Sequence, residues 1–183
     1  MIEDLSRQQA VRVAIVSDTH GYLYPDVLAV VENCDVAVHA GDIGSSRVLD
    51  VLQAGAGKVV AVRGNNDVPG LWAGDELDVL KTVPRVAELL LPGGMLAVEH
   101  GHVHGPMSPD LGKLRAAHRG ARVIVYGHTH KQLIDRSAEP WVLNPGAAGR
   151  IRNGGGPSCL VLNAMVDSWE VEAFRFPGAV MRD

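Results

Sequence analysis

Histidine, aspartate and asparagine side chains gather in five short motifs of this 183-residue chain. Imidazole nitrogens and carboxylate or amide oxygens are ligands for divalent transition metals. Each motif alone also fits an ordinary turn or helix cap, but the five together favour a shared metal site. Seven of the eight histidines lie in or beside them, and only His118 stands apart. The motifs are Asp18-Thr19-His20, Gly41-Asp42, Gly64-Asn65-Asn66-Asp67, His100-Gly101-His102 and Gly127-His128-Thr129-His130.

The spacing inside the motifs favours joint binding of one ion. On an extended segment, alternate side chains point to the same face, so an Asp-x-His or His-x-His pair presents two ligands together. Asp18 with His20 and His128 with His130 have this spacing. The neighbouring glycines allow the backbone to turn sharply and to approach the site closely.

A predicted strand ends directly before each motif. Short apolar runs rich in β-branched residues predict these strands, and helices predicted at 26–32 and 47–53 alternate with the first three. Ser45 and Ser46 are candidate N-caps of the second helix. This alternation predicts parallel βαβ pairing, and the carboxyl ends of parallel strands form a common crevice. The predicted strands are 11–17, 36–39, 58–62, 95–100 and 123–126.

The second half of the chain has a different pattern. The turn Pro92-Gly93-Gly94 separates two apolar runs and predicts a hairpin, and a helix is predicted over 111–119. The glycine run 154–156 is expected to be a turn and not a phosphate-binding loop, because no GK[ST] helix follows. We expect an α/β protein with a mixed sheet, or two sheets packed face to face with helices outside, in a single domain over 1–183. Further short strands are predicted at 131–135, 141–143, 159–163 and 169–174.

The composition excludes several classes of protein. Hydrophobic residues make up 46% and charged residues 21%, which is typical of a globular chain. The formal net charge of -4 and the 4% aromatic content disfavour a stable nucleic-acid complex. Cys34 and Cys159 have no CxxC spacing. The polar N-terminus and the lack of an apolar run of about 20 residues predict no membrane association and a cytoplasmic location.

In the order of its motifs, the chain resembles the calcineurin-like metallophosphoesterases, whose pattern is D-x-H, G-D, G-N-x-[D/E], a histidine in HGH, and G-H-x-H. The resemblance runs from about residue 11 to about residue 148. Asn144-Pro145-Gly146 and the compact length are similar to the small bacterial and archaeal phosphodiesterase branch. The resemblance implies a four-layer α/β/β/α sandwich with two mixed β-sheets and a dinuclear metal site above them.

The resemblance also implies which residues bind each metal. Asp42 would bridge two divalent ions, and every ligand position holds a competent residue. Imidazole-rich sites suit Mn, Fe, Zn, Co or Ni better than Mg or Ca, and we favour Mn. The first ion would be held by Asp18, His20, Asp42 and His130, and the second by Asp42, Asn65, His100 and His128.

The implied activity is that of a hydrolase, most simply a phosphodiesterase, in which a metal-bridging hydroxide attacks a small phosphoester. Nucleotides are among the candidate substrates. His102 is a candidate donor to the phosphoryl oxygen or the leaving group, or a neutral structural histidine. Asn66 occupies a position where many relatives carry His, and Asp67 is expected to orient a neighbour. Glu99 replaces a smaller hydroxyl residue, and its direction is left open.

Two alternative functions and two structural questions stay open at this point, besides the nucleic-acid-binding module that the composition disfavours. The first is a non-catalytic or weakly catalytic protein-interaction scaffold on the same fold, like the retromer scaffold subunit. The second is an amidohydrolase, which the early DxH and late HxH disfavour. The segment 68–83 is either a cap over the site or a surface loop with one packed Trp72. The oligomeric state is also open, a homo-oligomer included.

Overall fold

The computed structural model describes residues 1–150 and 156–177, which form two β-sheets and their covering helices. In the first, called the β2 sheet, β2, β3 and β4 run parallel and β10 pairs antiparallel with both β2 and β11. The predicted βαβ pairing of the first half is therefore confirmed. Its strand order is β11 (Trp169–Arg175), β10 (Ser158–Met165), β2 (Ala10–Val16), β3 (Val36–His39) and β4 (Val59–Ala61).

The second sheet, called the β6 sheet, is also mixed. Its central strands β6, β7 and β9 are parallel, while the predicted hairpin of β5 and β6 is antiparallel. Strand β8 pairs antiparallel with β9, and β1 adds to the other edge. The order is β1 (Ile2–Asp4), β5 (Val86–Leu91), β6 (Gly94–Glu99), β7 (Val123–Val125), β9 (Trp141–Pro145) and β8 (Gln132–Asp135).

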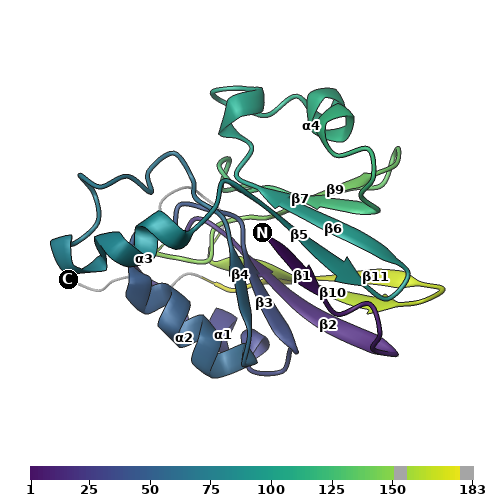
Figure 1. Ribbon diagram of the computed structural model, residues 1–183, viewed down its shortest axis with the longest axis horizontal. Helices are drawn as coiled ribbons and strands as arrows, with labels where there is room; N and C mark the ends of the chain where they lie inside the picture. The colour runs from purple at the N-terminus through teal and green to yellow at the C-terminus, as the bar shows by residue number, and fades with distance from the viewer. Residues whose placement is uncertain (151–155, 178–183) are drawn as a thin grey trace.

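The two sheets face each other, and helices cover their outer faces (Figure 1). Val13 and Ile15 of β2 belong to the core between the sheets, whereas Ala14 and Val16 pack toward the helices. This alternation explains the unbroken apolar sequence of β2, because both of its faces are buried. Helices α1 (Pro25–Val31) and α2 (Ser46–Ala56) cover the β2 sheet, and α4 (Leu111–Ala117) covers the β6 sheet. The expected four layers are confirmed.

The segment 68–83 folds against α2. It contains a 3-10 turn η1 (Gly74–Glu76) and helix α3 (Leu77–Thr82), with Trp72 and Leu80 buried in the helix-side core. The Glu76 carboxylate accepts hydrogen bonds from the hydroxyl groups of Ser45 and Ser46 at the start of α2. Ser45 is the N-cap, as predicted, and its hydroxyl accepts from the Arg47 N–H at 3.2 Å.

The predicted elements all occur, and their bounds differ from the predicted ones by three residues at most. Strand β1 and helix α3 were not predicted, because each is short and lacks a clear apolar period. The predicted helix at 111–119 ends at Ala117, which leaves His118 as its C-cap. Gly154 and Gly155 of the glycine run lie outside the described residues. Within 1–150 and 156–177, no helix is long and apolar enough to span a bilayer.

The sheets are tied together at the end remote from the five motifs. The indole N–H of Trp169 in β11 donates to the Pro92 carbonyl of the β5–β6 turn at 2.7 Å. The Arg122 guanidinium lies 5.0 Å from the Trp169 ring centroid and donates to the Gly93 carbonyl. These contacts define the inter-sheet lock, made of Pro92, Gly93, Arg122 and Trp169.

Candidate metal centre

The ends of five strands bring the predicted ligands together. We call them the strand-end cluster. Strands of the β2 sheet precede Asp18, His20, Asp42 and Asn65. Strands β6 and β7 precede the other three histidines, His100, His128 and His130. Two sets of three have ligand atoms within 4.8 Å of one another: Asp18, His20 and His130, and Asp18, Asp42 and His100. The strand-end cluster consists of Asp18, His20, Asp42, Asn65, His100, His128 and His130.

Asp42 lies between two groups of side chains. Its Oδ2 is 3.9 Å from His20 Nε2, and its Oδ1 is 3.4 Å from His100 Nε2. On the first side, His130 Nε2 lies 3.3 Å from His20 Nε2 and 3.4 Å from an Asp18 carboxylate oxygen. The two oxygens of one carboxylate therefore face two different groups of nitrogen and oxygen atoms.

The second group is built around Asn65. Its side-chain oxygen lies 3.1 Å from both His100 Nε2 and His128 Nδ1. Each imidazole is held from behind by a carbonyl: His100 Nδ1–H donates to Ala40 at 2.8 Å, and His128 Nε2–H donates to Pro106 at 3.0 Å. These bonds fix the tautomers and leave the other ring nitrogen facing inward, as metal-binding histidines require.

The charges in the cluster are strongly coupled. Burial opposes the charged form of Asp42, but hydrogen bonds and charge from His100, with hydrogen bonds from Asn66, outweigh burial and hold the pKa of its carboxyl well below the usual range. Burial likewise opposes a charged His100, but Asp42 and Asp18 outweigh it and raise the pKa of that imidazole. The carboxylates of Asp42 and Asp18 thus favour positive charge at this point of the cluster.

The backbone is strained where these side chains stand. Five non-glycine residues of the described chain have positive φ, between 47° and 69°: Asp18, His20, Asp42, His128 and His130. All five belong to the strand-end cluster. Such conformations are costly for residues with a Cβ and concentrate at functional sites. Backbone conformation therefore indicates a functional site at the strand-end cluster, as the metal-binding side chains do.

These residues fit a bound metal. Asp18 Oδ2 is buried and has no hydrogen-bond partner in the described chain, although an orphaned carboxylate oxygen is costly to bury. A Cβ on Gly64 would lie 2.1 Å from Asp42 Oδ1, so only glycine allows this approach. Imidazole, carboxylate and amide donors at this density match a divalent transition-metal site.

Asn66 and Asp67 contact the cluster in different ways. Asn66 donates two hydrogen bonds to Asp42, from its backbone N–H at 2.9 Å and from its amide at 2.6 Å. The buried Asp67 accepts from the N–H groups of Ile43, Gly44 and Gly64 and from the Trp72 indole. Asp67 thus joins the loops after β3 and β4 to the segment 68–83.

His102 lies at the margin of the cluster. Its ring centroid is 5.5 Å from that of His100 and 6.2 Å from that of His128. Its Nδ1 is buried without a hydrogen-bond partner among the described residues. Burial, reinforced by the neighbouring His100 and His128, lowers the pKa of His102, so its imidazole is neutral near pH 7.

Three supporting residues were noticed in the sequence, but it gave none of them the role that it has in the structure. The buried Asn144 donates to the Gly127 carbonyl at 2.6 Å and so holds the G-H-x-H turn. His39 Nδ1 accepts from the Gly41 N–H, and its Nε2–H donates to Thr19. Glu99 contacts two histidines outside the cluster. A polar residue at the end of an apolar strand was the available signal for all three.

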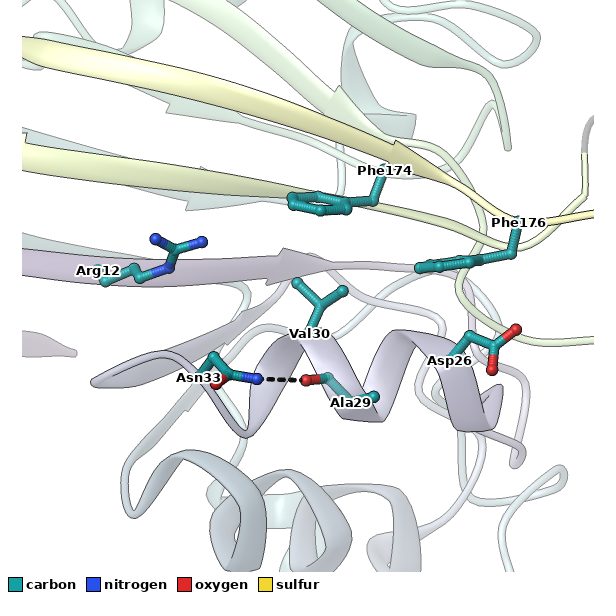
Figure 2. Close-up of a pocket in the computed structure, with 7 residues that line it drawn as sticks. All are labelled: Arg12, Asp26, Ala29, Val30, Asn33, Phe174 and Phe176. Atoms are coloured by element: carbon teal, nitrogen blue, oxygen red, sulfur yellow. Dashed lines mark hydrogen bonds between the residues drawn. The ribbon is translucent and has the colours of Figure 1, made fainter.

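A separate groove of about 680 Å³ lies between α1 and the end of β11 (Figure 2). Phe174 and Phe176 project over α1, with Arg12 toward one end and Asp26 toward the other. None of the residues that line it belongs to the five motifs, so it is distinct from the strand-end cluster. The lining residues are Arg12, Asp26, Ala29, Val30, Asn33, Phe174 and Phe176.

Comparisons with known proteins agree with this arrangement. A family model described as "Calcineurin-like phosphoesterase superfamily domain" matches residues 11–166. A probable metallophosphoesterase of Methanocaldococcus jannaschii is 34% identical over 142 residues, which cover 74% of this chain and 67% of that protein. Phosphodiesterase YfcE of Escherichia coli is 35% identical over 117 residues, covering 62% of this chain and 56% of YfcE.

Solved structures share the fold. The structure of YfcE, described as a phosphoesterase, aligns with a TM-score of 0.60 and 26% identity over 82% of this chain and 87% of its own. Vacuolar Protein Sorting 29 from Cryptosporidium parvum aligns with a TM-score of 0.73 and 17% identity, covering 92% of this chain and 99% of that one. At this low identity, the second likeness concerns the fold alone.

Proposed function

The chain belongs to the calcineurin-like phosphoesterase superfamily, and from this premise we propose that it is a phosphodiesterase that works with two divalent metal ions. The observation that carries the proposal is the position of Asp42, whose two oxygens face two separate groups of candidate ligands. Phosphodiesterase is also the name given to YfcE, which is 35% identical over the aligned segment.

We propose one ligand set for each ion, based on these two groups. Asp42 is shared. Four imidazoles mixed with carboxylate and amide oxygens suit Mn, Fe, Zn, Co or Ni better than Mg or Ca, and Mn is the ion we propose. When bound, the pair of ions activates the attacking water and neutralises charge on the phosphoryl group. The first set is Asp18, His20, Asp42 and His130, and the second is Asp42, Asn65, His100 and His128.

The residues around these sets orient substrate and ligands. Asn66 fixes Asp42 through two hydrogen bonds and does not supply a proton, because an amide has none to give at neutral pH. His102 stands beside His100 and His128, and its imidazole is the proposed hydrogen-bond donor to a phosphoryl oxygen or the leaving group. Asp67 holds the loops that carry Asp42 and Asn65.

This arrangement favours one class of substrate. Asn66 cannot protonate a leaving group. Esters whose leaving group departs without a proton should therefore be hydrolysed best. We expect activated aryl phosphodiesters to be cleaved faster than alkyl phosphomonoesters. The proposed natural substrates are small phosphoesters, nucleotides among them. A metal-matched comparison of the two ester types tests this, and preference for alkyl monoesters contradicts it.

The central experiment measures metal content and turnover in one set of proteins. Wild type loaded with Mn should hold about two equivalents and hydrolyse bis(p-nitrophenyl) phosphate. Asp42→Asn should lose most of the second ion and nearly all turnover, whereas Asp50→Asn, the same change on an exposed residue of α2, should keep both. A metal content of zero, or full activity in Asp42→Asn, overturns the proposal. Two bound ions without turnover would favour the scaffold alternative.

A further inference from the structure

Glu99 is a buried carboxylate that the metal centre does not use. It is the last residue of β6 and only 6% exposed. Because side chains alternate along a strand, Glu99 points to the opposite face from the neighbouring His100. Its Oε1 lies 2.8 Å from His104 Nε2, a close contact without hydrogen-bond geometry, and its Oε2 accepts a hydrogen bond from His118 Nε2 at 3.0 Å.

The two histidines come from different elements. His104 ends the short 3-10 turn η2 (His102–His104), and His118 is the C-cap of α4. The carboxylate therefore joins three segments at one buried point: the end of β6, the turn after the metal-site histidine, and the end of the covering helix. We call Glu99, His104 and His118 the carboxylate clamp.

The clamp is not a third metal site. Within the described chain, the groups of three side chains that converge closely enough for an ion belong to the strand-end cluster alone. Each oxygen of Glu99 instead faces its own histidine. This one-to-one pairing is suited to fixing position.

What the clamp fixes is the loop 101–110, which reaches the metal centre at two points. His102 stands beside His100 and His128. The Pro106 carbonyl accepts the Nε2–H of His128 and so orients the nitrogen that faces Asn65. Apart from the clamp, the loop is held chiefly by its own backbone bonds, such as Asp110 N–H to the His104 carbonyl. Met107 at its tip is 87% exposed.

We propose that Glu99 is a positioning residue, which holds the 101–110 loop through His104 and His118 so that His102 and the Pro106 carbonyl meet the metal-site side chains. The role in hydrolysis rests on the proposed function. The positional role rests on these contacts alone. Glutamine at position 99 keeps the shape of the side chain but removes its charge and one of its two acceptor oxygens, so it holds the two histidine N–H groups less well.

The first experiment tests position in the metal-free protein by hydrogen exchange. In Glu99→Gln and in His118→Ala, the amides of His104 and Asp110 should exchange about tenfold faster or more, because local opening of the loop costs less. Amides of β7 should be unaffected. Glu88→Gln on the neighbouring strand β5 makes the same chemical change away from the clamp and should leave loop exchange at the wild-type rate. Unchanged exchange in both clamp variants overturns the proposal.

The second experiment tests the consequence for the site with a double-mutant cycle on kcat/KM. Glu99→Gln and His102→Ala should each lower kcat/KM, the first by about tenfold, with metal content checked in all variants. If Glu99 acts by placing His102, its substitution should cost much less in the His102→Ala background. Full additivity overturns the link to His102, whereas a purely structural role would lower the melting temperature and leave the effects additive.

The two experiments separate the inference from the function it rests on. If wild type shows no turnover with any metal, the proposed function fails, and the exchange measurement still decides whether the clamp holds the loop. The imidazole Nε2–H signal of His128 gives a further readout in that case. It should lose its protection from solvent in Glu99→Gln if the Pro106 carbonyl moves away, and its persistence contradicts the positional role.

Discussion

At the scale of single residues, the strand-end cluster depends on the absence of a side chain at Gly64. Gly64 has no Cβ, and one placed there would lie 2.1 Å from Asp42 Oδ1 and 2.4 Å from the Asp42 nitrogen. We expect Gly64→Ala to lower the free energy of unfolding by about 1–3 kcal/mol through overpacking and to weaken metal binding by displacing Asp42. Urea unfolding and metal titration measure the two effects.

Gly70→Ala is the matched control for that prediction. A Cβ on Gly70 meets nothing within 4 Å, and its φ is not in the left-handed region. This variant should stay within about 0.5 kcal/mol of wild type and bind metal normally. Equal losses in both variants would mean that the close approach of Gly64 to Asp42 is not required.

His39 gives a second prediction at this scale, concerning pH. Full burial, opposed by Asp67 and Asp18, lowers the pKa of His39 from 6.5 to about 4. As pH falls below 6.5, the unfolded chain takes up a proton at His39 and the folded chain does not. Protonation of the unfolded chain therefore lowers the free energy of unfolding between pH 6.5 and about 4. The slope approaches ~1.4 kcal/mol per pH unit within this window.

Substitution of His39 should remove that slope. In metal-free protein, His39→Gln should show a flatter dependence of unfolding free energy on pH between 6.5 and 4, and the same dependence as wild type above pH 7. Denaturant titrations at several pH values give the comparison. Identical slopes in the two proteins would refute a neutral, buried His39.

At the scale of elements, the start of α2 depends on a residue from another segment. Glu76 Oε1 accepts from the Ser46 N–H at 3.0 Å and from both serine hydroxyls. Burial opposes the charged carboxylate, but these serine hydrogen bonds outweigh it and lower the pKa of Glu76. Glu76→Ala should cost about 0.5–2 kcal/mol, the usual range for a lost helix cap.

Thermal or urea unfolding of Glu76→Ala measures that loss, with Asp75→Ala as the control. Asp75 is the preceding residue, is exposed, and makes no contact comparable to that of Glu76. Its substitution should change stability by no more than about 0.5 kcal/mol. If the two variants lose the same amount, the contact between segment 68–83 and α2 contributes nothing.

The elements also show what the sequence could and could not predict. Strands such as β2 and β3 were located because β-branched runs followed by polar motifs have no helical period. Strand β1 was not predicted because its three residues, Ile2–Asp4, contain no run of β-branched residues. It pairs in parallel with β5 at the edge of the β6 sheet. The order of the motifs predicted which residues would lie together in the strand-end cluster, and the structure brings them together. The partners of Glu99 could not be predicted, because His118 is 19 positions away and sequence gives no distance.

At the scale of the whole molecule, the candidate metal centre lies where two sheets meet. Asp18 and Asp42 follow strands of the β2 sheet, and His100 and His130 follow strands of the β6 sheet. An ion bound between them therefore stabilises the native state. Saturating Mn at 100 times its dissociation constant should add about 2.7 kcal/mol for one site.

This coupling is tested against the inter-sheet lock. Trp169→Phe leaves the Pro92 carbonyl without its indole donor and should cost about 1–3 kcal/mol. Because the lock is remote from the metal centre, the gain from Mn should be the same in Trp169→Phe as in wild type. His130→Ala should lose most of that gain. Differential scanning calorimetry with and without metal provides the values, and a gain retained in His130→Ala contradicts the coupling.

The pairing of β10 with β2 has a consequence for how the chain acquires its structure. Leu160 pairs with Ile15, so a central strand of the β2 sheet comes from the opposite end of the chain. During synthesis, the sheet that carries Asp18 and Asp42 stays incomplete until β10 has left the ribosome. Such long-range pairing slows folding and leaves apolar strand edges exposed meanwhile. Until β10 emerges, the edge of β2 that it covers should therefore need protection from association with other chains.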